Sequence, residues 1–213
     1  MGKKSTTKII EELKRSRERL ELAQRAGKIG VYEWDMVKGT VWFSDQESKL
    51  FGKPGKKITK PADWISSMHP DDQPRVNARI HEAIANKKRY VGEFRIIRPD
   101  GNLVWLKSIG RTFYKDGKPM RMVEINYDIT ARKLSEELLK FNAEASRALA
   151  SSLNYRKTLS QVAQIAIQHM ADWCTVEMLD ENNQLELVAV AHKDPEKVKW
   201  AKELRAQNPT DLN

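Results

Sequence analysis

The chain is 213 residues long and carries 38 Lys and Arg against 29 Asp and Glu, a formal net charge of +9. Its 40% hydrophobic and 31% charged residues are typical of a globular protein and exclude a disordered one. The single cysteine excludes an internal disulfide framework, and no apolar run approaches membrane-spanning length. We therefore expect a soluble, cytoplasmic protein with no membrane span, long enough for one domain and part of a second.

The basic net charge invites a nucleic-acid function. The positive residues are, however, dispersed along the chain and mixed with acidic ones, as in "KRSRERLELAQR". The sequence has neither zinc-finger spacing nor an RNA-binding aromatic box. We therefore expect a solvated basic surface and no nucleic-acid partner.

The first predicted element is an amphipathic helix over residues 5–26, which Gly27 and Gly30 end. Apolar or small residues recur at heptad steps, at Ile9, Leu13, Ser16, Leu20 and Ala23. This seam fits a helix that lies on its own domain and fits a dimer seam equally well.

Strand periodicity begins at Val31, where "VYEWDM" and "TVWFS" flank a tight turn at Gly39. Helical pieces follow in "DQESKLFG" and "PADWISSM", and then in a longer helix from about Asp71, its expected N-cap, to Asn86. The next strands are "RYVGEFRII", "LVWLKSIGRTFY" and "MRMVEINYDIT", joined by the turns "RPDGN" and "KDGKP". This order predicts an α+β domain with helices on one face of an antiparallel sheet.

Residues 28–130 resemble a PAS domain of the PAS fold family 3 type, common in bacterial sensor proteins. The matching pieces, in family order and spacing, are "GVYEWD", "VWFSDQESKLFG", "WISSMHPDDQPRV", "GEFRIIRPDGNLVWL" and "GRTFYKDGKPMRMVEINYDITARK". The resemblance implies a five-stranded antiparallel sheet in the order 2-1-5-4-3, with a cavity between sheet and helices. Trp34, Phe94 and Ile96 alternate on the inner face and are candidates to line that cavity for a small-molecule ligand, or to form a closed core.

The last strand runs into a helix without an intervening turn, in "NYDITARKLSEELL". Asp128 and Thr130 share one strand face and Ile129 takes the other, Thr130 can cap the helix, and the basic side chains of Arg132 and Lys133 are within reach of Asp128. In PAS domains the matching Asp-Ile-Thr couples the last strand to the output helix. We therefore interpret these five residues as a signal-coupling joint. An ordinary strand end followed by a capped helix is the alternative.

The helix over residues 131–155 continues a heptad seam through Leu134, Leu138, Phe141, Ala145, Ala148 and Ser152. Beyond it, "ADWCTVEMLDENNQLELVAVAHKDPEK" resembles the beginning of a GAF domain, which implies a partial α/β segment. Because two strands would leave edges and an apolar face uncovered, we expect a fragment of a longer protein or an interrupted gene. The expected parts are a helix (1–27), a PAS sensory domain (28–130), a signalling helix (131–155) and a truncated GAF segment (156–213).

No catalytic or metal site is predicted. His81 and Glu82 lack the residues that follow a phosphoacceptor histidine in histidine kinases, and no Gly-rich nucleotide-binding box follows. His69, Asp71 and Asp72 are neighbours at a helix start, where side chains rarely converge on one ion.

No cofactor is evident from the sequence either. The Asn-Cys-Arg-Phe-Leu motif of flavin-binding PAS relatives is missing, and a haem would depend on a lone helical histidine, His81. His169 and His192 have no ligand partners at useful spacing. Cys174 lies in an apolar strand and is interpreted as a small core residue.

These features predict a sensory module, the N-terminal input region of a bacterial sensor histidine kinase. It would relay a ligand or partner signal through the Asp-Ile-Thr joint to a helix in a homodimer formed by the flanking helices. The alternatives are the input region of a serine phosphatase or of a cyclic-dinucleotide synthase, and a ligand-free PAS dimerisation module.

Overall fold

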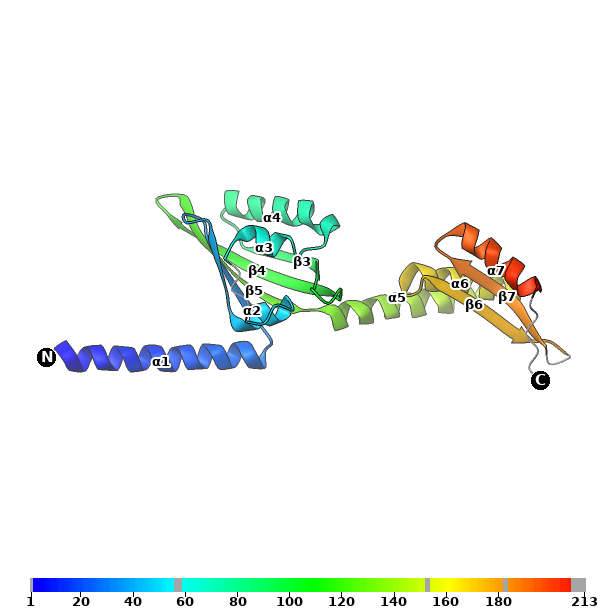
Figure 1. Ribbon diagram of the computed structural model, residues 1–213, viewed down its shortest axis with the longest axis horizontal. Helices are drawn as coiled ribbons and strands as arrows, with labels where there is room; N and C mark the ends of the chain where they lie inside the picture. The colour runs from blue at the N-terminus through cyan, green and yellow to red at the C-terminus, as the bar shows by residue number, and fades with distance from the viewer. Residues whose placement is uncertain (1, 56–58, 152–153, 182–183, 208–213) are drawn as a thin grey trace. The chain divides into compact units, whose positions relative to one another are not determined.

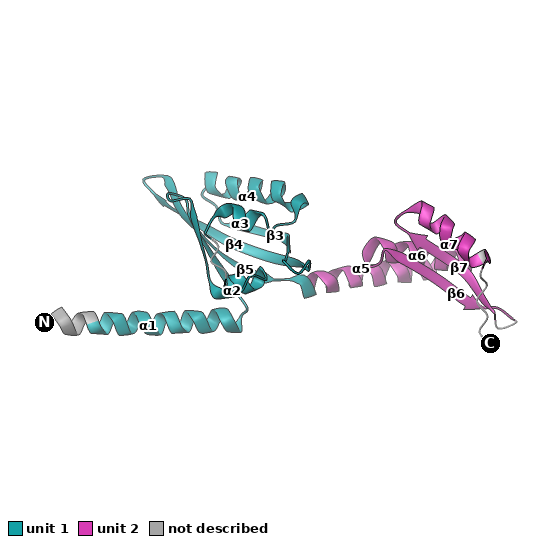
Figure 2. Cartoon of the chain, viewed as in Figure 1, with its two compact units in different colours: residues 1–131 teal, residues 132–213 magenta. Residues whose placement is uncertain are grey.

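The computed structural model describes residues 2–55, 59–151, 154–181 and 184–207. The chain divides into two compact units, residues 1–131 and residues 132–213 (Figure 2). We call them the PAS-like unit and the C-terminal unit, and each is described by itself.

The PAS-like unit contains the hairpin, helices and three-stranded meander predicted from the sequence. Its elements are α1 (Gly2–Ala26), β1 (Gly30–Asp35), β2 (Thr40–Phe43), α2 (Asp45–Leu50), α3 (Pro61–Ile65), the 3-10 turn η1 (Pro70–Asp72), α4 (Gln73–Ala85), β3 (Tyr90–Ile97), β4 (Leu103–Lys115) and β5 (Lys118–Asp128). The five strands form one antiparallel sheet in the order β2-β1-β5-β4-β3, as the resemblance implies (Figure 1). Asp116 and Gly117, both with positive φ, make the tight turn between β4 and β5.

The main core lies between the inner face of this sheet and the helices α2, α3 and α4. Its buried apolar members are Leu50, Phe51, Trp64, Met68, Val76, Ile80, Ala83, Tyr90, Phe94, Ile96, Val104, Leu106 and Met122. Each large apolar side chain buried in this way stabilises the fold by about 1.5–3 kcal/mol relative to an exposed one. The alternation of buried and exposed residues along β3, β4 and β5 therefore fixes which face of the sheet meets the helices.

The start of the long helix differs from the sequence-based expectation. The segment expected to begin at Asp71 is the 3-10 turn η1 followed by α4, and the N-cap of α4 is Asp72. The carboxylate of Asp72 makes no capping hydrogen bond, because the side chain of Arg95 binds it. The prediction that Asp71 caps this helix is therefore wrong.

The C-terminal unit is smaller. Its elements are α5 (Thr130–Ala150), whose first two residues belong to the PAS-like unit, α6 (Tyr155–His169), β6 (Trp173–Leu179), β7 (Leu185–His192) and α7 (Pro195–Gln207). The two strands pair antiparallel, and their buried cluster with α6 consists of Ala163, Ile167, Ala189 and Ala191. Cys174 is partly buried and packs against this cluster, as its apolar strand predicts.

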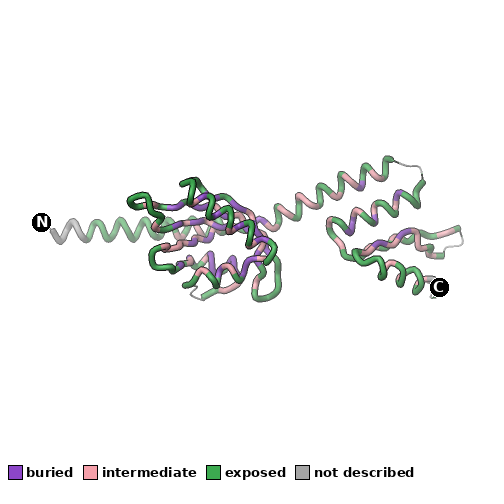
Figure 3. Tube along the Cα trace, turned by 90° about the horizontal axis from the view of Figure 1, so that it is seen from above, coloured by how far each residue is buried: buried purple, intermediate pink, exposed green. Residues whose placement is uncertain are grey.

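Both long helices expose much of their predicted seams (Figure 3). On α1, Ile9, Leu13 and Leu20 are each more than half exposed. On α5, Leu134 is 67% exposed whereas Ala145 is buried, and Ser152 of the same predicted seam lies outside the described residues. Within the described ranges, no helix is both long and apolar enough to cross a membrane.

Candidate functional site

Two neighbouring rows across the inner face of the PAS-like sheet are polar or lack a side chain. By strand register, one row is Gly30, Asn126, Ser108 and Gly92, and the next is Tyr32, Glu124, Gly110 and Tyr90. Every one of these residues is buried. A sheet face packed against helices is normally apolar, so these two rows mark a specialised part of the interior.

The side chain of Glu47 enters this region from α2. Ser44 begins the helix: its hydroxyl oxygen accepts hydrogen bonds from the backbone N–H groups of Glu47 (3.2 Å) and Val31 (3.0 Å). This places the fully buried Glu47 over Gly30, where a Cβ atom would lie only 1.9 Å from Glu47 Oε2. The Nδ2 group of Asn126 donates a 2.7 Å hydrogen bond to Glu47 Oε1, which joins α2 to β5.

A second buried carboxyl group, that of Glu124, lies on β5 itself. The hydroxyl of Ser108 donates a 2.6 Å hydrogen bond to Glu124 Oε2. Gly110 leaves room for this side chain, since a Cβ atom there would lie 2.6 Å from Glu124 Cγ. Gly92 likewise leaves room for the hydroxyl of Tyr90. The two glycines therefore leave room on the inner face of the sheet for these polar side chains.

Burial controls the ionisation of both acids. It raises the pKa of Glu47 to about 8, although the hydrogen bond from Asn126 acts in the opposite direction and the nearby Glu124 adds to the increase. Burial also raises the pKa of Glu124 to about 7, against the hydrogen bond from Ser108. The pKa of the Tyr32 hydroxyl is raised by its burial and by both acids. Both acids therefore hold their protons to a higher pH than an exposed glutamate does.

Several buried polar atoms in this interior have no hydrogen-bond partner among the described residues. They are Glu47 Oε2, Asn126 Oδ1, Tyr90 Oη, Thr112 Oγ1, Trp34 Nε1 and Trp64 Nε1. Leaving a buried donor or acceptor unpaired costs about 1–3 kcal/mol each. Folded proteins retain few such groups, so this cluster marks the interior as a candidate site.

The predicted cavity residues lie beside this polar region. Phe94 and Ile96 are fully buried members of the main core, and Trp34 is partly buried and packs against it. The sequence-based argument missed Glu124 and Asn126, although their alternation with Met122 along β5 already places all three on one face.

The joint between β5 and α5 is held by the backbone of Trp105 on β4. The N–H of Ile129 donates to the carbonyl oxygen of Trp105 (2.9 Å), and the N–H of Trp105 donates to Thr130 Oγ1 (3.0 Å). The N–H of Thr130 in turn donates to Asp128 Oδ1 (2.8 Å). The hydroxyl oxygen of Thr130 thus accepts a hydrogen bond from the neighbouring strand, and the carboxylate of Asp128 accepts one from the first N–H of the helix.

Arg98, in the turn between β3 and β4, is a basic residue near Asp128 that the sequence did not indicate. Its guanidinium lies 3.9 Å from Asp128 Oδ2, and its Nε donates a 2.8 Å hydrogen bond to the carbonyl oxygen of Leu50 at the end of α2. Arg132 and Lys133 both form ion pairs with Glu136 on α5. Sequence reasoning missed Arg98 because only the tertiary fold brings this turn to the joint.

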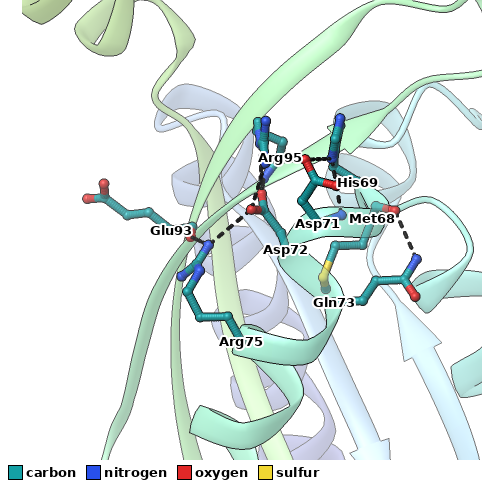
Figure 4. Close-up of polar contacts among 8 residues, drawn as sticks. All are labelled: Met68, His69, Asp71, Asp72, Gln73, Arg75, Glu93 and Arg95. Atoms are coloured by element: carbon teal, nitrogen blue, oxygen red, sulfur yellow. Dashed lines mark hydrogen bonds and ion pairs between the residues drawn. The ribbon is translucent and has the colours of Figure 1, made fainter.

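Figure 4 shows a clamp between η1 and the edge strand β3. The two carboxylate oxygens of Asp72 accept hydrogen bonds from Arg95 Nε (3.0 Å) and Nη2 (2.9 Å), and Oδ2 also accepts from the Arg95 backbone N–H (2.8 Å). Nδ1 of His69 accepts from the N–H of Asp71 (3.3 Å), so these residues serve local structure. The described residues contain no cluster of three potential metal ligands.

The pKa of Asp72 follows from the clamp. Burial alone would raise it, but the hydrogen bonds from the side chain and backbone of Arg95 lower it to about 2. The guanidinium of Arg95 also lies 5.6 Å from the ring centre of Trp105, the residue that holds the joint. The clamp therefore fixes the edge strand β3 beside β4, the strand whose Trp105 backbone holds the joint.

The C-terminal unit holds its own ionisable cluster and its own hollow. His169 on α6 lies 3.2 Å from Glu137 and 3.0 Å from Glu144, both on α5, although spacing along the sequence gave it no partner. A cavity of about 350 Å³ lies between the sheet and α7, and Trp173 and Trp200 are among its lining residues. It is of the size that small-molecule ligands occupy.

Comparison with known proteins identifies the fold of the first unit. Residues 40–126 match the family described as PAS fold. A crystal structure of a sensory box histidine kinase/response regulator from Burkholderia thailandensis is 28% identical, with a TM-score of 0.54, over 61% of this chain and 98% of that one. This part of the chain therefore adopts a PAS fold, and the sequence-based prediction of that fold is confirmed.

The curated relatives are much longer proteins. The chain is 28% identical over 137 residues to a probable diguanylate cyclase, DgcE, of Escherichia coli, which covers 61% of this chain and 12% of that protein. It is 24% identical over 156 residues to the non-motile and phage-resistance protein of Caulobacter vibrioides, covering 70% of this chain and 17% of that protein. The chain therefore spans less than a fifth of the length of either relative.

Proposed function

We propose that this chain is a sensory input region of a larger bacterial signalling protein, with a sensor histidine kinase as the parent. In this proposal a small molecule or partner changes the interior of the PAS fold, and the change passes through Asp128, Ile129 and Thr130 to α5. The flanking helices α1 and α5 would form a homodimer in the cytoplasm, and the C-terminal unit would be the first part of a GAF domain. The similarity to a sensory box histidine kinase supports the choice of parent.

The observation that carries the proposal is the bonding of the joint. The first residue of α5 is bound to β4 through the hydroxyl of Thr130 and to β5 through the carboxylate of Asp128, with no flexible turn between strand and helix. Arg98 adds a contact from the same joint to the end of α2. A shift of the sheet or of α2 therefore acts directly on the start of the helix, as a two-state switch requires.

A second candidate is the input region of a cyclic-dinucleotide synthase. The similarity to a probable diguanylate cyclase favours it. The two candidates share the sensory mechanism and differ in the output domain. Incubating the complete parent protein with labelled ATP or with labelled GTP distinguishes them, since a kinase gives a phosphoprotein and a cyclase gives a cyclic dinucleotide.

The variant Asp128→Ala in the parent protein tests the relay. It removes the bond to the N–H of Thr130 and the charge near Arg98, and we expect the output activity to change by at least about fivefold, the lower end of typical coupling between sites. Asp63→Ala, an exposed residue of α3, serves as the matched control and should leave output unchanged. Circular dichroism checks that both variants are folded. Equal output from Asp128→Ala, the control and the wild type would refute the relay.

A further inference from the structure

The interior of the PAS fold contains two carboxyl groups without a basic partner. Glu47 and Glu124 are 0% and 2% exposed, and the polar partners that the described part of the chain gives them are not Lys or Arg side chains. Their hydrogen-bond donors are a neutral amide, Asn126, and a neutral hydroxyl, Ser108. Nothing in these contacts compensates a negative charge fully.

The groups that face the two acids from the other elements are also neutral at physiological pH. Burial and the charges of both acids raise the pKa of the Tyr32 hydroxyl on β1. Burial and the charge of Glu124 raise the pKa of the Tyr90 hydroxyl on β3. Arg79 and Arg75 on α4 act on the hydroxyl of Tyr90, where they lower its pKa against the effect of burial. Removing an ionised carboxylate from water without a counter-ion is costly, and a second negative charge close by increases the cost. The closed interior is therefore stable with both acids protonated.

The position of Glu47 connects its protonation to the joint. Its hydrogen bond to Asn126 joins α2 to β5 two residues before Asp128. The other end of α2 is bound at Leu50 by Arg98, which also faces Asp128. A displacement of α2 therefore alters two separate contacts near the joint, one through Asn126 and one through Arg98.

We propose that Glu47 and Glu124 are a proton-binding site, and that loss of these protons to water is the signal that displaces α2 from β5. The inference rests on the proposed relay and specifies what the relay responds to. On loss of a proton each carboxylic acid becomes a carboxylate, and the new charges draw water to the acceptors Glu47 Oε2 and Asn126 Oδ1, which lack partners among the described residues. The interior opens on the side of α2, and the first turn of α5 loosens.

The direction of the response follows from burial. Because burial raises the pKa of both acids toward neutrality, the interior holds its protons in mildly acidic solution and loses them as the pH rises through about 7 and about 8. The closed state therefore belongs to low pH and the opened state to high pH.

Carbon-13 NMR of the glutamate carboxyl groups in the whole chain, titrated from about pH 4 to pH 9.5, tests the site directly. We expect two carboxyl resonances with midpoints two or more pH units above the ordinary glutamate value of about 4.3. One should vanish in Glu47→Gln and the other in Glu124→Gln. Glu82→Gln, an exposed position on α4, is the matched control and should leave both of these resonances in place. Ordinary midpoints for all glutamates would overturn the proposal.

Two further measurements keep the test decisive if a glutamine variant does not fold. Ser108→Ala removes the hydroxyl that favours ionised Glu124, so the lower of the two shifted midpoints should rise, and an unchanged midpoint would contradict the assignment. Amide exchange at Ile129 and Thr130, corrected for its intrinsic pH dependence, should accelerate between pH 6 and pH 8.5. Equal protection at both values would refute the connection to the joint.

The two proposals fail separately. Ordinary glutamate midpoints together with an effect of Asp128→Ala on output would remove the proton site and leave the relay. Shifted midpoints together with no effect of Asp128→Ala would support the proton site and remove the relay.

Discussion

The two units of this chain each pack helices against an antiparallel sheet, and they differ in how much they bury. In the PAS-like unit five strands and three helices enclose a cluster of 13 buried core residues. In the C-terminal unit two strands and α6 enclose a cluster of four, three of them alanines. Trp173, Trp200 and Leu204 remain 37–58% exposed there. The comparison shows that the width of the sheet decides how large a core can be.

The units also differ in where they place ionisable groups. The PAS-like unit buries Glu47 and Glu124 under its helices, whereas the C-terminal unit keeps His169 with two glutamates near its surface. A buried acid is costly, and only a large surrounding core can offset that cost. The difference explains why the two buried glutamates lie in the first unit.

The largest expected effect concerns core size. Phe94→Ala removes a fully buried ring from the main core and should destabilise the PAS-like unit by about 3–5 kcal/mol. Ile167→Ala, in the small cluster of the C-terminal unit, should cost about 2 kcal/mol, the lower end for such changes, because few neighbours surround it. Amide exchange in β4 and in β7, measured in denaturant, reports each unit separately. An equal loss in the two units would contradict the argument from core size.

A smaller effect is expected from the clamp in Figure 4. Asp72→Asn leaves Arg95 without its charged partner and should destabilise the PAS-like unit by about 2 kcal/mol at pH 7. Because the folded-state pKa of Asp72 is lowered to about 2, its contribution is complete above the unfolded value of about 3.9 and disappears as the pH falls toward 2. Unfolding free energies at pH 7 and pH 3 measure this.

Asp71→Asn is the matched control for the clamp. Its side chain is 73% exposed and its nearest guanidinium distance to Arg95 is 3.6 Å, so its contribution should be within about 0.5 kcal/mol. If Asp71→Asn and Asp72→Asn destabilise equally, the clamp has no special role.

The smallest effect is expected in the C-terminal unit. Hydrogen bonds to Glu144 and Glu137 raise the pKa of His169 in the folded state. Its contribution to stability is therefore complete below the unfolded value of about 6.5 and is lost as the pH rises through the folded value. His169→Gln should lower the thermal midpoint of this unit at pH 6 and change it less at pH 8.5. His81→Gln, at an exposed position on α4 of the other unit, is the control and should leave the thermal midpoint of the C-terminal unit unchanged.

The sequence predicted the elements of both units well, because their signals are local. Turn residues such as Asp116 and Gly117 separate strands, and a period of two fixes the buried face of each strand. The failure at Asp71 has a tertiary cause. Asp72 is also a good capping residue by type, but the guanidinium of Arg95, 23 residues further along the chain, binds its carboxylate.

The candidate site was only partly predictable. The Asp-Ile-Thr joint is visible in the sequence because strand and helix meet without a turn. The contacts that hold it come from Trp105 and Arg98, which lie 25 and 30 residues before Thr130 and Asp128. Sequence spacing cannot predict such contacts, because they depend on the register of three neighbouring strands.

By itself the sequence determined the α+β class, the strand order implied by the family resemblance, the inner and outer faces of the sheet and the position of the joint. Propensity, periodicity and turn chemistry act over a few residues, so they can be recognised from the sequence alone. Only the tertiary structure decided that Glu47 of α2 lies over Gly30 beside Asn126 and within the influence of Glu124, and that Arg98 faces Asp128. Desolvation and charge pairing depend on distance in space, and folding alone sets those distances.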